Sequence, residues 1–215
     1  MTALAAELAP LDLHQSFQDF IASRPDEETW ELIAGRFIVQ AQPNFDHQII
    51  AGNLDRLLTD GIERLGLARV SMQNPAVDLR PALEGHVYVP DVAVLDLAEI
   101  EPGRNVASAC YLAAEIVSPS DRRRPAGKGS RKIEIKLAGY EALPACEAVL
   151  LVEPRAFDAT VSERSGAGWS RRRLTGPDAR LVLACAGLEC RLAELYARTS
   201  LARTLARPLA RPRDQ

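Results

Sequence analysis

The sequence has few cysteines, no long apolar run and little excess charge. Its four cysteines form no Cys-x-x-Cys pair, and three of them lie in apolar segments where a thiol packs as a small hydrophobe, which argues against structural zinc. No apolar run approaches the roughly 20 residues that a membrane-spanning helix needs, and the first ten residues lack the basic start of a secretory signal. We therefore expect a reduced, cytoplasmic protein with no membrane partner.

A formal net charge of -3 gives the chain no overall attraction to nucleic acid, so affinity for phosphate has to come from local patches. A hydrophobic content of 47% in 215 residues is enough for one well-buried domain. We expect that domain over residues 29–197, between an N-terminal lead-in (1–28) and a basic C-terminal tail (198–215). The tail repeats Leu-Ala-Arg, but Pro208 and Pro212 interrupt any helix there, so we expect a solvated cationic tail rather than a DNA-binding arm.

The spacing of apolar residues predicts a mixed α/β fold. Intervals of three and four predict helices, whereas short apolar runs bounded by turn residues predict strands. Ala34-Gly35 suits a tight hairpin turn because glycine takes the positive φ that such turns require, and Asn44 and Asp46 are candidate helix N-caps. The predicted helices cover residues 13–22, 46–65, 131–142 and 190–197, and the predicted strands cover 30–33, 36–39, 68–73, 76–79, 86–97, 111–117, 147–153 and 180–184, with an exposed hairpin over 160–163 and 169–174.

Two acidic residues interrupt apolar strands. Asp91 lies within Val87–Val94, and Glu115 lies within Tyr111–Val117. An isolated ionised carboxylate in a dry interior costs many kcal/mol, so a buried acid needs a metal, a base or a shared proton. Either acid alone is most simply a strand-end residue in contact with water, whereas the two together favour a metal site.

A basic loop follows the Glu115 strand and leads into the helix predicted over 131–142. The loop contains Gly127-Lys128 but lacks the earlier glycine of a Walker motif, so we expect no nucleoside triphosphate site. Apolar residues at i, i+4 and i+7 of the helix place Lys136 on or beside its inward face. A lysine there commonly extends its ammonium to water; if it reaches the acids, it can stabilise charge that develops on a phosphate.

Several segments of the chain occur in a characteristic order. They are Trp30–Arg36, His47 on a helix, Val89-Pro90-Asp91, Glu115-Ile116-Val117-Ser118-Pro119-Ser120, Lys136–Tyr140 and Val149–Pro154. This order resembles the Uma-type restriction endonuclease family of the PD-(D/E)XK nuclease superfamily. The resemblance covers about residues 28 to 175, and the Glu115 segment with the upstream Pro90-Asp91 is its most specific part.

The resemblance implies a restriction-endonuclease-like core, which is a mixed β-sheet flanked by helices, with an N-terminal β-hairpin. It also implies that Asp91 and Glu115 hold a divalent metal ion with the backbone carbonyl of Ile116, and such hard oxygen ligands fit Mg²⁺ or Mn²⁺ better than zinc. The superfamily's usual lysine, two positions after the second acid, is Val117 here. Lys136 matches the lysine that related proteins supply from the following helix, and Lys132, one turn earlier, is the alternative.

Two further residues have both a functional and a structural interpretation. His47, near the start of its helix, either contacts phosphate or assists the attacking water, or it is a partly buried histidine satisfied by the backbone. Glu31 either completes the metal shell from the hairpin or is an exposed strand acid that faces Arg36.

These features predict a Mg²⁺- or Mn²⁺-dependent endonuclease that hydrolyses DNA, with Asp91, Glu115, Lys136 and His47 as catalytic residues. The cations next to the proposed site suit contact with a phosphate backbone; they are Arg122, Arg123, Arg124, Lys128, Arg131 and Lys132. One alternative, slightly favoured by Val117, is a catalytically silent protein of the same fold that binds nucleic acid or a protein partner. Another is an assembly protein that uses the C-terminal tail. A homodimer is common among restriction-type folds, but the sequence identifies no interface and does not separate DNA from RNA.

Overall fold

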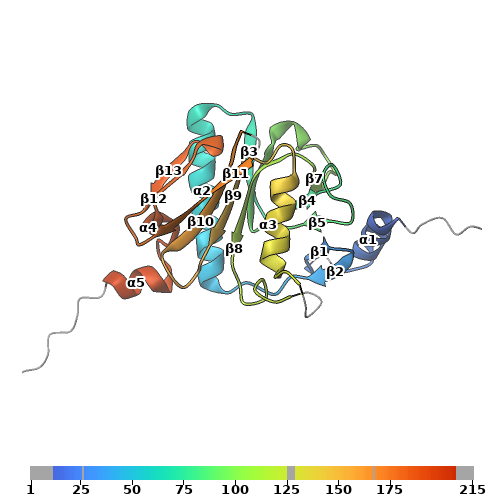
Figure 1. Ribbon diagram of the computed structural model, residues 1–215, viewed down its shortest axis with the longest axis horizontal. Helices are drawn as coiled ribbons and strands as arrows, with labels where there is room; N and C mark the ends of the chain where they lie inside the picture. The colour runs from blue at the N-terminus through green and yellow to red at the C-terminus, as the bar shows by residue number, and fades with distance from the viewer. Residues whose placement is uncertain (1–11, 26, 125–128, 167, 207–215) are drawn as a thin grey trace, which may run out of the picture.

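The computed structural model describes residues 12–206 except 26, 125–128 and 167. Its larger sheet has six strands in the order β11-β10-β9-β8-β6-β3, and helices α2 (Phe45–Leu65) and α3 (Lys132–Ala142) pack on its opposite faces (Figure 1). Strands β8 and β9 are parallel and joined through α3, whereas the other pairings are antiparallel. The sheet is therefore mixed, as predicted. Its strands are β3 (Arg69–Gln73), β6 (Val92–Asp96), β8 (Cys110–Ile116), β9 (Ala148–Val152), β10 (Asp158–Ser165) and β11 (Gly168–Thr175).

A second sheet of five short strands carries the N-terminal hairpin. Its order is β2-β1-β5-β4-β7, formed by β1 (Trp30–Ile33), β2 (Arg36–Val39), β4 (Ala76–Asp78), β5 (Val87–Tyr88) and β7 (Val106–Ala107). The remaining elements are the pair β12 (Arg180–Leu183) and β13 (Leu188–Arg191), the helices α1 (Leu13–Ala22), α4 (Leu192–Leu195) and α5 (Ser200–Ala206), and two 3-10 turns, Leu97–Glu99 and Ala184–Ala186. Helix α1 packs on the hairpin through aromatic contacts such as Phe17 with Phe37, at ring centroids 5.2 Å apart.

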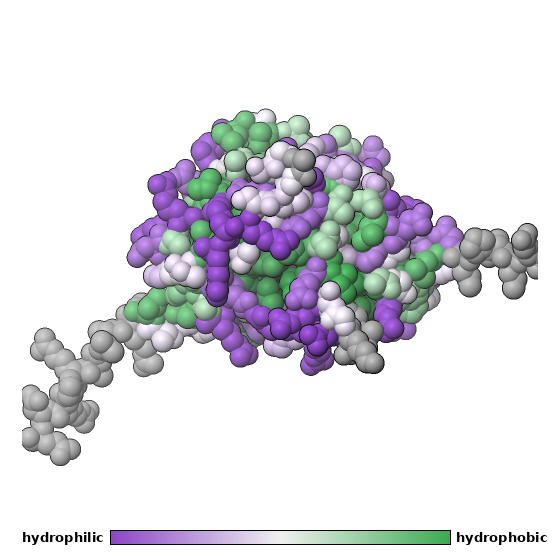
Figure 2. Space-filling model, viewed as in Figure 1, coloured by the Kyte–Doolittle hydropathy of each residue, from purple (hydrophilic) through white to green (hydrophobic). Residues whose placement is uncertain are grey.

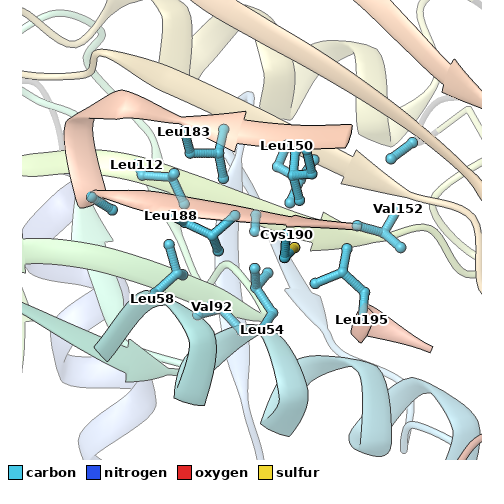
Figure 3. Packing of buried hydrophobic residues seen from close by; sticks show 14 of the residues in the cluster. Leu54, Leu58, Val92, Leu112, Leu150, Val152, Leu183, Leu188, Cys190 and Leu195 are labelled. Atoms are coloured by element: carbon cyan, nitrogen blue, oxygen red, sulfur yellow. The ribbon is translucent and has the colours of Figure 1, made fainter. Parts of the chain in front are cut away.

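The largest apolar core lies between α2, the six-stranded sheet and the β12–β13 pair (Figure 3). Leu54 and Leu58 of α2 belong to this core together with Leu112 of β8 and Leu150 of β9. Side chains alternate between the two faces of a sheet. Because Ala114 and Ile116 point into this core, Glu115 between them projects from the opposite face, where α3 lies.

The α3 face of the sheet forms a second core, which it shares with the five-stranded sheet. Tyr140 of α3 packs edge-on against Tyr88 of β5, with ring centroids 5.3 Å apart. Gly139 permits this approach, because a Cβ at that position would lie 2.6 Å from the Tyr88 ring. The contact holds α3 against the five-stranded sheet and thereby brings residues of the hairpin close to Glu115.

The structure splits the single strand predicted over 86–97 into β5 and β6, which belong to different sheets. The segment Val89-Pro90-Asp91 crosses between them. Pro90 has no N–H, and the N–H of Val89 donates to a carboxylate oxygen of Glu31 at 3.0 Å, so the strand ladder stops there. The break places Asp91 directly before β6, at the edge of the larger sheet.

Two other predicted elements differ from the structure. The helix predicted over 190–197 is wrong in its first part, because strand β13 continues to Arg191 and the helix α4 covers only Leu192–Leu195. Buried Leu188 and Cys190 alternate with exposed neighbours in β13, a strand pattern too short to stand out in the sequence. Strand β10 is also less exposed than predicted, because it pairs with β9 inside the sheet. Strands β1 and β2 of the N-terminal hairpin and helix α1 have the predicted bounds, and Asn44 is the N-cap of α2.

On the face shown in Figure 2, hydrophilic residues surround an apolar area near the centre of the molecule. Hydrophilic residues also gather along the lower edge of this view, where the N-terminal ends of α2 and α3 lie in Figure 1. Across the described ranges, no helix combines the length and the apolar character needed to span a bilayer. The homodimer stays a prediction.

Two glycines of α2 predict opposite responses to alanine. A Cβ on Gly61 would lie 2.8 Å from the backbone carbon of Gly187, whereas a Cβ on Gly52 meets nothing within 4 Å. We expect Gly61→Ala to lower the free energy of unfolding by about 1–3 kcal/mol through overpacking. We expect Gly52→Ala to raise it by up to about 1 kcal/mol, because alanine favours helix. Urea denaturation of both variants tests this, and equal effects would contradict the packing of α2 on the 184–187 turn.

Candidate active site

The predicted acid pair lies in one cleft at the edge of the larger sheet. The cleft has a volume of about 840 Å³, and its walls include Asp91, Glu115, His47 and Lys136. Asp91 precedes β6, whereas Glu115 is the penultimate residue of β8. The site is therefore near the N-terminal ends of α2 and α3, at the lower edge of the molecule in Figure 1. All four residues predicted to be catalytic are brought together.

Asp91 is held by groups from two elements. Its Oδ2 accepts the backbone N–H of Ile116 at 2.7 Å and lies 3.2 Å from Nε2 of His47. His47 is placed by the cap of α2, because its N–H donates to the side chain of Asn44 at 3.0 Å. Burial lowers the pKa of His47, but the hydrogen bond and charge of Asp91 outweigh it and raise the pKa above the usual value. The backbone of His47 therefore supports the start of the helix and its ring faces the acid, while its role toward phosphate or water stays a prediction.

Glu115 is buried beside one cation and one hydroxyl. Its Oε1 lies 2.6 Å from Nζ of Lys136 and accepts the hydroxyl of Tyr140 at 2.7 Å. Burial raises the pKa of Glu115 to about 8 in spite of the neighbouring Lys136 charge. Burial also disfavours the charged form of Lys136, yet the carboxylates of Glu115 and Glu31 outweigh it and raise the Lys136 pKa. The ammonium of Lys136 thus lies directly beside the second acid and comes from the helix that follows the strand of Glu115.

Glu31 contacts both lysines of α3, and the expectation that it is an exposed acid facing Arg36 is wrong. Its side chain is fully buried; Oε1 lies 2.7 Å from Lys136 Nζ, and Oε2 lies 2.8 Å from Lys132 Nζ. In the hairpin, Arg36 pairs with Ile33 rather than with Glu31. Burial raises the pKa of Glu31, but the charges of the two lysines outweigh it and lower the pKa below its usual value.

Lys132 occupies a different place from Lys136. Besides Glu31, it lies 3.5 Å from Oδ1 of Asp121, a buried acid in the turn after β8. The other oxygen of Asp121 accepts the N–H of Ser118 at 2.8 Å and its hydroxyl at 2.6 Å. Lys136 is therefore the lysine beside Glu115, while Lys132 links the hairpin to the turn that carries the basic loop.

The other predicted phosphate-binding cations differ in their availability. Arg122 is bound by both oxygens of Glu153, at 2.5 and 2.6 Å. Arg123 and Arg124 are exposed, and Arg123 lines the cleft. Arg131 is exposed at the N-cap of α3, with Glu134 3.9 Å away. Lys128 lies outside the described residues.

The oxygen donors of the cleft fit a magnesium or manganese ion. Among the described residues, no hydrogen bond reaches Oδ1 of Asp91 or Oε2 of Glu115, so each carboxylate keeps one oxygen for a cation. The N–H of Ile116 donates to Oδ2 of Asp91, while its backbone also helps to raise the pKa of His47, so the Ile116 carbonyl lies in the same group as the two acids. The described ranges contain no set of three or more His, Cys, Asp or Glu arranged around one point. Two carboxylates suffice for Mg²⁺, which keeps several waters and takes further oxygens from phosphate.

A mixed sheet with two acids at the ends of adjacent strands, and a lysine supplied by the crossover helix, defines a restriction-endonuclease-like protein. The chain matches the Uma2 family model, described as "Putative restriction endonuclease", over residues 15–193. It belongs to this family. A structure from Anabaena variabilis ATCC 29413, described as a putative nuclease belonging to DUF820, aligns with a TM-score of 0.64 and 18% identity, covering 87% of this chain and 98% of that one. No curated protein matches the sequence.

Sequence patterns missed the buried partners of the predicted residues. Tyr140 ends the Lys136–Tyr140 segment, but nothing in the sequence showed that its hydroxyl donates to Glu115. The apolar neighbours of Glu31, Trp30 and Leu32, were a sign that its strand is buried. Asp121 gave no signal, because it follows a Ser-Pro-Ser turn where an exposed acid is ordinary.

The hydrogen bond between Tyr140 and Glu115 predicts a stability effect. Tyr140→Phe keeps the ring packed on Tyr88 but removes the donor from a buried carboxylate, so the free energy of unfolding should fall by about 1–3 kcal/mol. Tyr111→Phe is the matched control, because its hydroxyl donates to Asp96 at 2.7 Å near the surface and its loss should matter less. Urea denaturation of the two variants measures the difference, and an equal or larger loss in Tyr111→Phe would contradict this prediction.

Proposed function

We propose that the protein is a metal-dependent endonuclease that hydrolyses DNA phosphodiester bonds, with Mg²⁺ or Mn²⁺ as cofactor. The observation that carries the proposal is the convergence of Asp91, Glu115 and Lys136 in one cleft, from two strands and the helix that follows. Each acid offers an unengaged oxygen, and the lysine offers a buried ammonium. Membership of a family described as nucleases supports the same class of reaction.

The residues of the cleft divide the work of hydrolysis. Asp91 and Glu115 would hold the cation, which when bound polarises a phosphoryl oxygen and lowers the pKa of water. Lys136 stabilises the negative charge that develops on the phosphate in the transition state. His47, fixed by Asp91, is placed to orient the attacking water or to donate to the phosphate.

The rim of the cleft supplies contacts for a nucleic acid backbone. Arg123 lines the cleft, and no carboxylate partner for it occurs in the described part of the chain. Arg122 lines the same wall but is already engaged by Glu153. An exposed cation next to a cation site suits a phosphate neighbouring the one that is cleaved, because neutralising phosphates releases counterions.

Cation binding tests the acid pair. We expect Mn²⁺ and Mg²⁺ to bind the native protein in isothermal titration calorimetry, and we expect Asp91→Asn to abolish the specific signal because it removes a charged ligand oxygen. Asp178→Asn is the control, since Asp178 is an exposed acid outside the cleft. Absence of specific binding in the native protein would contradict the metal site.

Plasmid nicking with Mn²⁺ tests the reaction. We expect Glu115→Ala and Lys136→Ala each to lower the nicking rate roughly 100-fold or more, because each removes a group that stabilises the transition state. Glu101→Ala, at an exposed position, should nick like the native protein. A native protein that binds the cation but nicks neither DNA nor RNA would instead support the catalytically silent alternative, which the valine at position 117 had favoured.

Arg122 and Arg123 should contribute differently to the salt dependence of DNA affinity. DNA affinity, measured without divalent cation, should fall with rising salt, and Arg123→Ala should reduce the slope of log affinity against log salt by about 1. Arg122→Ala should reduce it less, because Glu153 already neutralises that guanidinium. Equal slopes for the native protein and both variants would remove this wall of the cleft from the DNA contact.

A further inference from the structure

Glu31 differs from the two acids proposed to hold the cation in how its oxygens are used. Its Oε1 lies 2.7 Å from Lys136 Nζ and accepts the N–H of Val89 at 3.0 Å, while its Oε2 lies 2.8 Å from Lys132 Nζ. Both oxygens are therefore engaged by cations or a backbone donor. Asp91 and Glu115, in contrast, each concentrate their partners on one oxygen.

Glu31 is also the only contribution of the hairpin to this group of charges in the described part of the chain. It comes from β1 of the five-stranded sheet, whereas Glu115 comes from β8 of the six-stranded sheet and both lysines come from α3. The charges alternate in sign through Glu115, Lys136, Glu31, Lys132 and Asp121. Each ammonium is thus held between two carboxylates.

Such an arrangement fixes side chains that are otherwise mobile. A lysine has a flexible four-carbon stem and loses much rotamer entropy when its ammonium is held in one place. Lys136 and Lys132 both line the cleft, and Glu31 sets the positions of their ammonium groups. A fixed cation needs no reorganisation when charge develops on a bound group.

We infer that Glu31 is a positioning residue, not a cation ligand: it holds Lys136 against Glu115 and presents Lys132 to a second, neighbouring phosphate of the substrate. The role in catalysis rests on the proposed nuclease function, whereas the ion pairs do not. Through Glu31, the five-stranded sheet thereby takes part in the active centre.

A charge-exchange series tests the inference. Glu31→Gln keeps the shape but leaves two buried ammonium groups with one carboxylate fewer, whereas Glu31→Gln combined with Lys132→Met restores the charge balance. Lys132→Met alone and Glu101→Gln, at an exposed position, complete the series. Thermal unfolding of each variant identifies any that fails to fold. If Glu31→Gln alone fails to fold, the double variant is used in its place, because its charge balance is restored.

The positioning role predicts a separation of two readouts. In Glu31→Gln the single-turnover cleavage rate at saturating DNA should fall roughly 10- to 100-fold, as for other groups that orient ligands, while Mn²⁺ affinity stays much closer to native than in Asp91→Asn. The double variant should recover Mn²⁺ affinity fully and cleavage in part. The inference is overturned if Mn²⁺ affinity falls in Glu31→Gln as far as in Asp91→Asn and stays low in the double variant, because Glu31 would then be a ligand.

A spectroscopic readout separates this inference from the nuclease proposal. The chain contains only three lysines, so ¹⁵N-lysine labelling gives a simple NMR spectrum. In this spectrum the protons on the buried Nζ of Lys136 should exchange slowly with water. We expect this signal to shift or broaden in Glu31→Gln and to be unchanged in Glu101→Gln. If the native protein cleaves no nucleic acid but the Lys136 signal changes in Glu31→Gln, the nuclease proposal fails and the positioning role of Glu31 holds. If the Lys136 signal is the same in Glu31→Gln as in the native protein, the positioning role is wrong.

Discussion

The buried ammonium of Lys136 is the interaction on which the site depends. It is 1% exposed and lies within 2.7 Å of carboxylate oxygens from two different sheets. A buried charge without a partner costs several kcal/mol, and removing one member of a buried pair typically costs about 3–5 kcal/mol. The hairpin, β8 and α3 must therefore come together before any of these charges can be buried. Assembly of the cleft is in this way part of folding, because the same ion pairs that close the second core also hold the groups proposed to act on phosphate.

The placement of the acids follows from two simple properties of the chain. Side chains alternate along β8, so a strand whose neighbours Ala114 and Ile116 belong to the α2 core must project Glu115 toward α3. Pro90 ends the ladder of β5, so the chain crosses to the larger sheet and leaves Asp91 at its edge, where the N–H of Ile116 binds it. The apolar neighbours of the two acids had suggested positions inside strands. Instead, Asp91 directly precedes β6 and Glu115 is the penultimate residue of β8. Both lie at the ends of neighbouring strands and line the cleft, where a cation can reach them.

Local patterns predicted the elements with strong periodicity and the residues that carry a motif. The helix α2, the hairpin and the strand of Glu115 were visible because their apolar spacing extends over whole elements, and the lysine of α3 was visible because its helix face could be counted. Strand β13 and the break at Val89–Asp91 were not, because each is set by a few residues whose conformation depends on a partner strand. The basic loop correctly indicated that cations lie beside the cleft. Composition could not show that Arg122 is paired with Glu153, whereas Arg123 has no such partner among the described residues.

By itself, then, the sequence determined the mixed α/β class, the family resemblance and the two candidate acids, since these depend on the pattern along one chain. Only the tertiary structure decided that Lys136 rather than Lys132 lies beside Glu115, that Glu31 is a buried partner of both lysines, and that Tyr140 donates to the same carboxylate. The physical reason is that these contacts join residues from different helices and strands, over sequence separations of 21 residues and more. No local pattern records which side chain a buried charge will meet across such a distance.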